Sequence, residues 1–223
     1  MTQLDVEMQL LKAEVKEMWH LVLSQLTKSK VSLLYLDKDM ALEVIFGEKR
    51  VNAYELNIDR KCENMFALFN PVAVDLRYVL AVLKINSNLE RIGDNIESIA
   101  KFSMNIDVLF DKKLLEVSRV IEMYDEVNKM LSDVLNAFDK EDTAIARSVF
   151  KKDEILDNIN INSNVIVADY IINNKDLIEQ GLYVLSIIKK LERIGDQSKN
   201  IAEEIIFYIE AKVLKHLTEE EMK

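Results

Sequence analysis

The sequence predicts an all-α protein of two tandem three-helix bundles, in which six long helices form an internal pseudo-twofold repeat. Turn residues are scarce, because the 223 residues include only 4 Gly and 1 Pro, whereas strand-rich folds need many turns. Apolar residues make up 49% of the chain and recur every three or four positions, as in amphipathic helices. The segment Leu89–Asp94 (LERIGD) returns unchanged at Leu191–Asp196, 102 residues later, which indicates a duplicated unit.

Three helices are predicted in the first half, over about residues 4–35, 38–69 and 71–105. The first follows an apolar seam from Leu4 to Leu26 whose steps alternate between three and four residues. Asp37–Asp39 is a polar break that can cap the second helix, because a side-chain oxygen can accept from the free backbone N–H groups of a first turn. Asn70 and Pro71 mark the start of the third, since proline suits the first turn of a helix.

The second half repeats this plan, with helices predicted over about residues 117–138, 143–172 and 176–215. Asp139–Asp142 mirrors the polar break of the first half, and Asn173–Asn174 supplies the last turn. We place the two domains at residues 1–106 and 107–223, joined near residues 106–110. That junction has no low-complexity linker, so we expect the bundles to pack end to end.

The charge and the apolar pattern of the chain exclude several classes of protein. A net charge of −10 argues against nucleic-acid binding, which needs a basic face. No apolar run reaches the roughly 18 residues of a transmembrane helix, and the amino terminus lacks the pattern of a secretory signal. The single cysteine, Cys62, lies among apolar helical positions and is expected to be buried, with a reactive thiol as the alternative. We expect a cytoplasmic protein.

Each copy of the repeated segment carries two acids four residues apart, which places both carboxylates on one helix face. At about 100° per residue, Glu90 and Asp94 lie opposite the apolar seam of their helix, and Glu192 and Asp196 do the same. The preceding helix of each half carries a second polar line on its outer side. These lines are Glu48, Asn52, Glu55 and Asp59, and Asp153, Asp157, Asn160 and Asn164. Adjacent antiparallel helices therefore set two acidic lines side by side in each half.

Two interpretations of these lines are open. Acids opposite an apolar seam normally form a solvated face. Like charges four residues apart, however, disfavour a helix by roughly a few tenths of a kcal/mol, and facing acidic lines add to the repulsion. A cation between the lines relieves it. An all-oxygen ligand set suits Mg, Mn, Fe or Zn and does not choose among them.

The segment Leu191–Glu210 closely resembles the second repeat motif of PhoU, a phosphate-signalling regulator family of bacteria and archaea. Pro71–Arg77, followed by Leu89–Asp94, resembles the first motif. The acidic stretches before residues 52 and 157 are similar as well, so the resemblance covers essentially the whole chain. It implies two three-helix bundles, a homodimer, and multinuclear metal clusters on the bundle surface.

The metal motif of that family is an acid, three residues and then Asp, with one copy on each participating helix. The resemblance implies divalent or trivalent ions (iron, zinc, magnesium or manganese). The ligands that it implies are Glu48, Asn52, Glu90 and Asp94 in the first half, and Asp153, Asp157, Glu192 and Asp196 in the second. Asn52 stands where the family usually has Asp, which predicts a weaker or smaller first cluster. Asn95 and Gln197 stand where the family often has His, so an imidazole contribution is lost.

The resemblance also implies a function and partners. PhoU-type proteins restrain phosphate uptake and keep the phosphate-starvation response off, linking the phosphate ABC transporter to a membrane sensor histidine kinase. The implied partners are the ATPase subunit of the transporter and the kinase, with membrane association only through them. Two alternatives stay open: an accessory regulator of a sodium-coupled phosphate transporter, and a metal-free helical scaffold.

The sequence shows no catalytic constellation. A ferritin-like di-metal enzyme needs two Glu-x-x-His motifs, and the chain has one, Glu17–His20. It has no glycine-rich phosphate loop and no nucleophile beside a base. Arg91 and Arg193, which follow the repeated glutamates, are expected to pair with neighbouring carboxylates rather than with phosphate. We therefore expect a regulator and not an enzyme.

Overall fold

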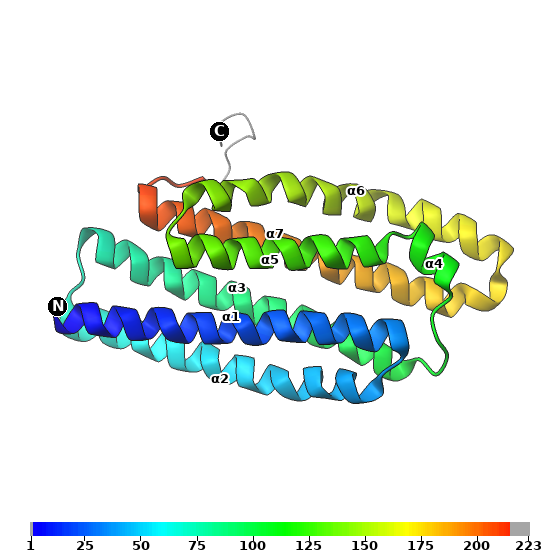
Figure 1. The fold of residues 1–223 in the computed structure, drawn as a ribbon, viewed down its shortest axis with the longest axis horizontal. Coiled ribbons are helices and arrows are strands. Elements are labelled where there is room, and N and C mark those ends of the chain that lie inside the picture. The colour runs from blue at the N-terminus through cyan, green and yellow to red at the C-terminus, as the bar shows by residue number, and fades with distance from the viewer. Residues whose placement is uncertain (1, 215–223) are drawn as a thin grey trace.

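The computed structural model describes residues 2–214, and the regular elements of that part of the chain are all helices. The long helices, which lie roughly along one direction in Figure 1, are α1 (Gln3–Tyr35), α2 (Lys38–Phe69), α3 (Ala73–Asn105), α5 (Val120–Lys140), α6 (Thr143–Asn173) and α7 (Ile178–Glu210). A short helix, α4 (Lys112–Val117), and a 3-10 turn at Lys175–Leu177 lie in the connections. None of the described helices is apolar over enough of its length to cross a bilayer. The predicted all-α class is confirmed.

Acidic side chains cap the helices where the sequence predicted polar breaks. At the start of α2, Asp37 Oδ1 accepts a hydrogen bond of 2.9 Å from the N–H of Met40. At the start of α6, Asp142 Oδ1 accepts one of 2.8 Å from the N–H of Ala144. These bonds satisfy backbone donors that have no partner inside the helix. The helix starts after both breaks are therefore set by local chemistry.

Three helix ends differ from the predicted ones. Pro71 precedes α3, which begins at Ala73, so the proline is not in the first helical turn. The helix expected from residue 117 begins at Val120, because Arg119 takes a left-handed conformation (φ 56°) that separates it from α4. The last helix ends at Glu210, and Ala211 is left-handed (φ 58°). Residue 215, the predicted end, lies outside the described part of the chain.

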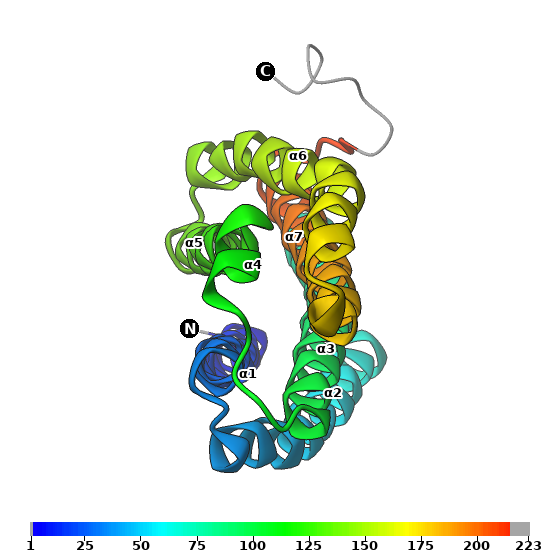
Figure 2. The ribbon, with the colours of Figure 1, turned by 90° about the vertical axis from the view of Figure 1, so that its right-hand side faces the viewer.

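The two halves of the protein lie side by side, so the expectation of end-to-end packing is wrong (Figures 1 and 2). Helices α3 and α7 pack along each other in antiparallel directions at the junction. Near one end of this pair, Lys84 Nζ donates a hydrogen bond of 2.9 Å to Glu204 Oε2. Near the other end, the ring centroids of Phe102 and Tyr183 are 5.7 Å apart.

The width of the buried face on α3 and α7 explains this packing. A single apolar seam would let a helix pack within one bundle only. Both of these helices, however, bury residues that are adjacent in the sequence. Examples are Ala81 with Val82 in α3, and Ile187 with Ile188 in α7. Neighbouring side chains point about 100° apart on a helix, so each helix presents apolar surface both to its own half and to the other half. The two halves consequently share one core.

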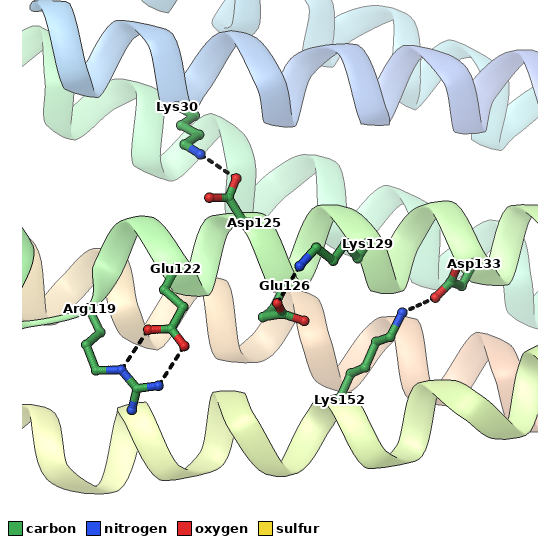
Figure 3. A network of polar contacts seen from close by, with 8 residues as sticks. All are labelled: Lys30, Arg119, Glu122, Asp125, Glu126, Lys129, Asp133 and Lys152. Carbon is green, nitrogen blue, oxygen red and sulfur yellow. Dashed lines mark hydrogen bonds and ion pairs between the residues drawn. The ribbon is translucent and has the colours of Figure 1, made fainter.

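Helices α1 and α5 form a second contact between the halves. Trp19 is fully buried, and its Nε1 donates a hydrogen bond of 3.1 Å to the carbonyl oxygen of Leu131. Its ring also packs on Phe138, with centroids 5.8 Å apart. On the exposed side of the contact, Lys30 of α1 forms an ion pair with Asp125 of α5 (Figure 3). The halves are thus joined along two pairs of helices.

Candidate functional site

The repeated glycines, Gly93 and Gly195, allow the acid-bearing helices of each half to approach closely. A Cβ atom added at Gly93 would lie 3.2 Å from Cγ1 of Val51 in α2. A Cβ atom at Gly195 would overlap Cδ1 of Leu156 in α6. Because only glycine lacks this atom, α2 packs closely on α3, and α6 packs closely on α7. The acidic side chains stand within one helical turn of these contacts.

In the first half, Glu48 is the acid most removed from water, with 6% of the residue exposed. Its Oε2 accepts a hydrogen bond of 2.8 Å from Asn52 Nδ2. Its Oε1 and the Oδ1 of Asn52 are buried and have no hydrogen-bond partner within residues 2–214. Burial raises the pKa of Glu48, and the charges of Asp94 and Glu97 raise it further. Buried oxygens without hydrogen-bond partners are uncommon. Their free lone pairs fit a ligand that binds oxygen atoms, such as a metal ion.

Glu90 lies among the same carboxylates. Burial raises its pKa to about 7, and Asp94, Glu55 and Glu48 contribute in that order through like-charge repulsion. Burial also raises the pKa of Glu55, with help from Asp59 and Asp94. We refer to Glu48, Asn52, Glu55, Glu90, Asp94 and Glu97 as the first cluster. Glu97 was missed as a candidate, although its place three residues after Asp94 puts it on the same helix face.

In the second half, a lysine lies among the predicted acids. Lys199 Nζ donates a hydrogen bond to Oδ2 of Asp153 and lies 3.8 Å from Oδ1 of Asp196. Burial raises the pKa of Asp153, which is 5% exposed, although Lys199 opposes the shift. Burial also raises the pKa of Glu192, and repulsion from Asp196 and Asp157 adds to it. Burial lowers the pKa of Lys199, but its hydrogen bond to Asp153 and the negative charges of Asp153, Asp196 and Asp157 together raise it overall.

We refer to Asp153, Asp157, Glu192, Asp196 and Lys199 as the second cluster. Sequence reasoning missed Lys199, which stands three residues after Asp196 and so lies on the acidic face. The structure thus gathers the eight predicted residues into two groups of four, one in each half. Within residues 2–214, no three Asp, Glu, His or Cys side chains converge closely enough to hold an ion as they stand. Coordination of a metal by these residues therefore stays a prediction.

The two clusters fit a cation to different degrees. The first offers a buried carboxylate oxygen and a buried amide oxygen that have no hydrogen-bond partner among the described residues, and hard cations are bound by such oxygens. In the second, the ammonium group of Lys199 already contacts Asp153 and Asp196. The donor set of the first cluster fits a metal ion better than that of the second.

The two repeated segments also meet each other, in a hollow of about 520 Å³ at the junction of α3 and α7. Arg91 and Asp94 of the first segment, and Arg193 and the neighbouring Lys190 of the second, are among its lining residues. Neither arginine forms an ion pair with a carboxylate in the described part of the chain, contrary to expectation. The hollow is thus lined by both positively and negatively charged side chains.

Comparison with known proteins matches both halves to one family. The model of the PhoU domain matches residues 15–103 and 120–205. A phosphate-specific transport system accessory protein PhoU homolog from Burkholderia sp is 30% identical over 222 residues, which cover 99% of this chain and 94% of that protein. The phosphate-specific transport system accessory protein PhoU of Escherichia coli strain K12 is 29% identical, over 99% of this chain and 90% of that protein.

Solved structures show the same fold. The crystal structure of PhoU from Pseudomonas aeruginosa superposes with a TM-score of 0.85 at 27% identity, covering 94% of this chain and 100% of that one. The phosphate transport system regulatory protein PhoU from Streptococcus pneumoniae superposes with a TM-score of 0.82 at 28% identity, covering 95% of this chain and 99% of that one. The same overall fold, which includes both halves, has therefore been observed in crystal structures.

Proposed function

The chain belongs to the PhoU family, and we propose on this basis that it is an accessory protein of phosphate-specific transport that regulates phosphate uptake and phosphate-starvation signalling. The observation that carries the proposal is the match of both halves, over nearly the whole chain, to proteins with that name. The repeated acidic segments give this role a physical basis, because each half presents a charged face that can respond to ions or partners.

In this proposal the protein is a negative regulator without catalytic activity. It contacts the ATPase subunit of the phosphate ABC transporter and a sensor histidine kinase, and it reaches the membrane only through them. It acts in the cytoplasm as a homodimer. Sedimentation of the purified protein tests the dimer, and a monomer at micromolar concentration contradicts it.

The acidic clusters are proposed to bind metal ions such as iron, zinc, magnesium or manganese. The orphaned oxygens of Glu48 and Asn52, and the mutual repulsion around Glu90, support this role. A bound cation supplies positive charge that lets α2 and α3 hold their carboxylates side by side. Metal analysis of the purified wild-type protein tests it, and the absence of bound metal after incubation with each ion favours a metal-free scaffold.

Deletion of the gene tests the regulatory role. We expect the deletion to raise alkaline phosphatase, or an equivalent starvation output, in phosphate-rich medium, because the kinase is no longer held off. The wild-type gene on a plasmid should restore the low output. Unchanged output in the deletion strain contradicts the link to the kinase.

Two further measurements identify the transporter. Phosphate uptake is measured with and without the gene in strains that lack the ABC transporter, and an effect that persists there indicates another client, such as a sodium-coupled transporter. Co-purification with the tagged ATPase subunit, with and without added metal, tests direct contact. If the protein does not co-purify with the ATPase subunit either with or without metal, the proposed partner is contradicted.

A further inference from the structure

The two halves carry opposite charges at one equivalent position of their acidic faces. Glu97 and Lys199 each stand three residues after the aspartate of the repeated segment, Asp94 or Asp196. We infer that Lys199 serves as a built-in cation of the second cluster, so that the first cluster is the one that takes up a metal ion. This inference rests on the proposed metal binding and goes beyond it by assigning the two clusters different roles.

The side chain of Lys199, on α7, reaches across to α6. Its ammonium group contacts Asp153 of α6 and lies 3.8 Å from Oδ1 of Asp196 on α7. Asp153 is only 5% exposed, so its charge needs a partner inside the protein. Lys199 supplies that partner, and Asp153 has no buried oxygen without a hydrogen bond in residues 2–214. The second cluster therefore has much of its charge compensated by the chain itself.

Within residues 2–214, the first cluster has no cation that contacts its buried carboxylate as Lys199 contacts Asp153. The counterpart of Lys199 is Glu97, which adds a negative charge near Glu48. Lys101 pairs with Glu97 at 2.6 Å and opposes the rise in the pKa of Glu48, but Lys101 is exposed and leaves Glu48 Oε1 without a hydrogen bond in residues 2–214. In the described part of the chain, the Oε1 of Glu48 is buried and has no hydrogen-bond partner, in contrast to the oxygens of Asp153. The buried Oε1 of Glu48 and much of the charge of this cluster are thus left for an added ion.

The donors of the first cluster define the class of ligand. Carboxylate oxygens and the amide oxygen of Asn52 are hard ligands, which favour divalent ions such as Mg²⁺ or Mn²⁺ over soft ions. The replacement of an acid by Asn52 keeps an oxygen donor, and Glu97 and Glu55 supply further charge nearby. On this inference the first cluster binds metal more strongly than the second, the opposite of the ranking that Asn52 alone suggested.

Equilibrium dialysis against Mn²⁺, with bound metal quantified by mass spectrometry, tests the inference on the full-length protein. Glu48→Gln with Glu90→Gln removes charge from the first cluster. Asp157→Asn with Glu192→Gln is the matched change in the second cluster, and it leaves the contact between Lys199 and Asp153 intact. We expect the first double variant to weaken Mn²⁺ binding by at least about tenfold. The second should change it by less than about twofold.

Lys199→Gln provides the complementary test, because it removes the internal cation without adding an acid. We expect it to lower the melting temperature without metal, to gain a second class of Mn²⁺ sites, and to show a larger rise in melting temperature with Mn²⁺ than wild type. If this variant does not fold, the two double variants decide the question.

The outcomes separate this inference from the proposed metal binding. If wild type binds Mn²⁺ and the second double variant loses it, metal binding stands and the role of Lys199 is overturned. Equal losses in both double variants, or a folded Lys199→Gln protein without additional sites, also overturn it. If neither wild type nor any variant binds Mn²⁺, the proposed metal binding fails together with this inference.

Discussion

Gly195 and Leu156 are packed so tightly that a methyl group at position 195 would overlap Cδ1 of the leucine. Leu156 is fully buried in the core. The equivalent glycine of the first half, Gly93, leaves 3.2 Å between an added Cβ and Val51. The two copies of the repeated segment therefore differ in how closely their glycine approaches the neighbouring helix.

This difference predicts unequal effects of alanine in the two halves. Gly195→Ala should lower the free energy of unfolding by up to about 2 kcal/mol, because the cost of overpacking, about 1–3 kcal/mol, is set against a gain in helix propensity of about 1 kcal/mol. Gly93→Ala is the matched control and should change it by less than about 1 kcal/mol. Urea unfolding followed by circular dichroism measures both. Equal effects, or a more stable Gly195→Ala protein, contradict the packing argument.

The shared core predicts that both halves unfold together. Trp19 is the only tryptophan, and it lies buried between α1 and α5, so its fluorescence reports the contact between the halves. Urea unfolding should show the same midpoint by tryptophan fluorescence and by circular dichroism, as in a two-state transition. Two separate midpoints would show that one half unfolds before the other.

Trp19→Phe should weaken the same contact. It removes the hydrogen bond to the carbonyl of Leu131 and part of the buried ring. Loss of the bond costs about 1 kcal/mol, and the smaller ring leaves a cavity with a cost of its own. We therefore expect the unfolding free energy to fall by about 2 kcal/mol or more, measured by circular dichroism because the fluorophore is lost. A fall of less than about 0.5 kcal/mol contradicts the importance of this contact.

Cys62 is expected to be unreactive in the native protein. It is fully buried, as predicted, and burial raises the pKa of its thiol to about 12, with further contributions from Asp59 and Glu63. The thiolate is the reactive form, so little of it exists at pH 8. Alkylation by iodoacetamide should be slow in buffer and fast in concentrated urea. Rapid labelling of one thiol in native protein would show that the site opens readily.

Asp111 is expected to make stability depend on pH. Its Oδ1 accepts hydrogen bonds from the N–H of Leu114 at 2.7 Å and from the hydroxyl of Tyr170 at 2.8 Å. The bond to Leu114, followed by the one to Tyr170, lowers the pKa of Asp111. A lowered folded pKa stabilises the protein above the unfolded value of about 3.9, and this contribution is lost as the pH falls through the folded value.

Asp111→Ala should therefore lower the unfolding free energy by about 1 kcal/mol at pH 7, the usual effect of losing a helix cap. The difference from wild type should narrow as the pH falls below about 4. Tyr170→Phe keeps the cap and removes one donor, so its effect should be smaller. A difference between wild type and Asp111→Ala that is constant from pH 7 to pH 3 contradicts this account.

Short-range pattern was sufficient to predict the long helices and their main caps. The acidic lines were predicted to face outward, but Glu48 and Asp153 are buried. Asp37 and Asp142 cap α2 and α6 through residues two or three positions away, so neighbouring sequence contains the whole interaction. Glu90 with Asp94, and Glu192 with Asp196, share helix faces because four residues make about one turn. The repeated segment led to the family for the same reason, since it is contiguous in the chain.

The arrangement of the halves and the inequality of the clusters could be seen only once distant helices were in place. The adjacent apolar residues on α3 and α7 are visible in the sequence. The sequence does not show that these two helices pack on each other through them. From the sequence, Lys199 would likewise be interpreted as a solvated lysine. Its partner Asp153 is 46 residues away in the chain and lies next to it only because α6 packs on α7. Periodicity describes one helix at a time, whereas packing energy and charge pairing depend on which faces of separate helices meet.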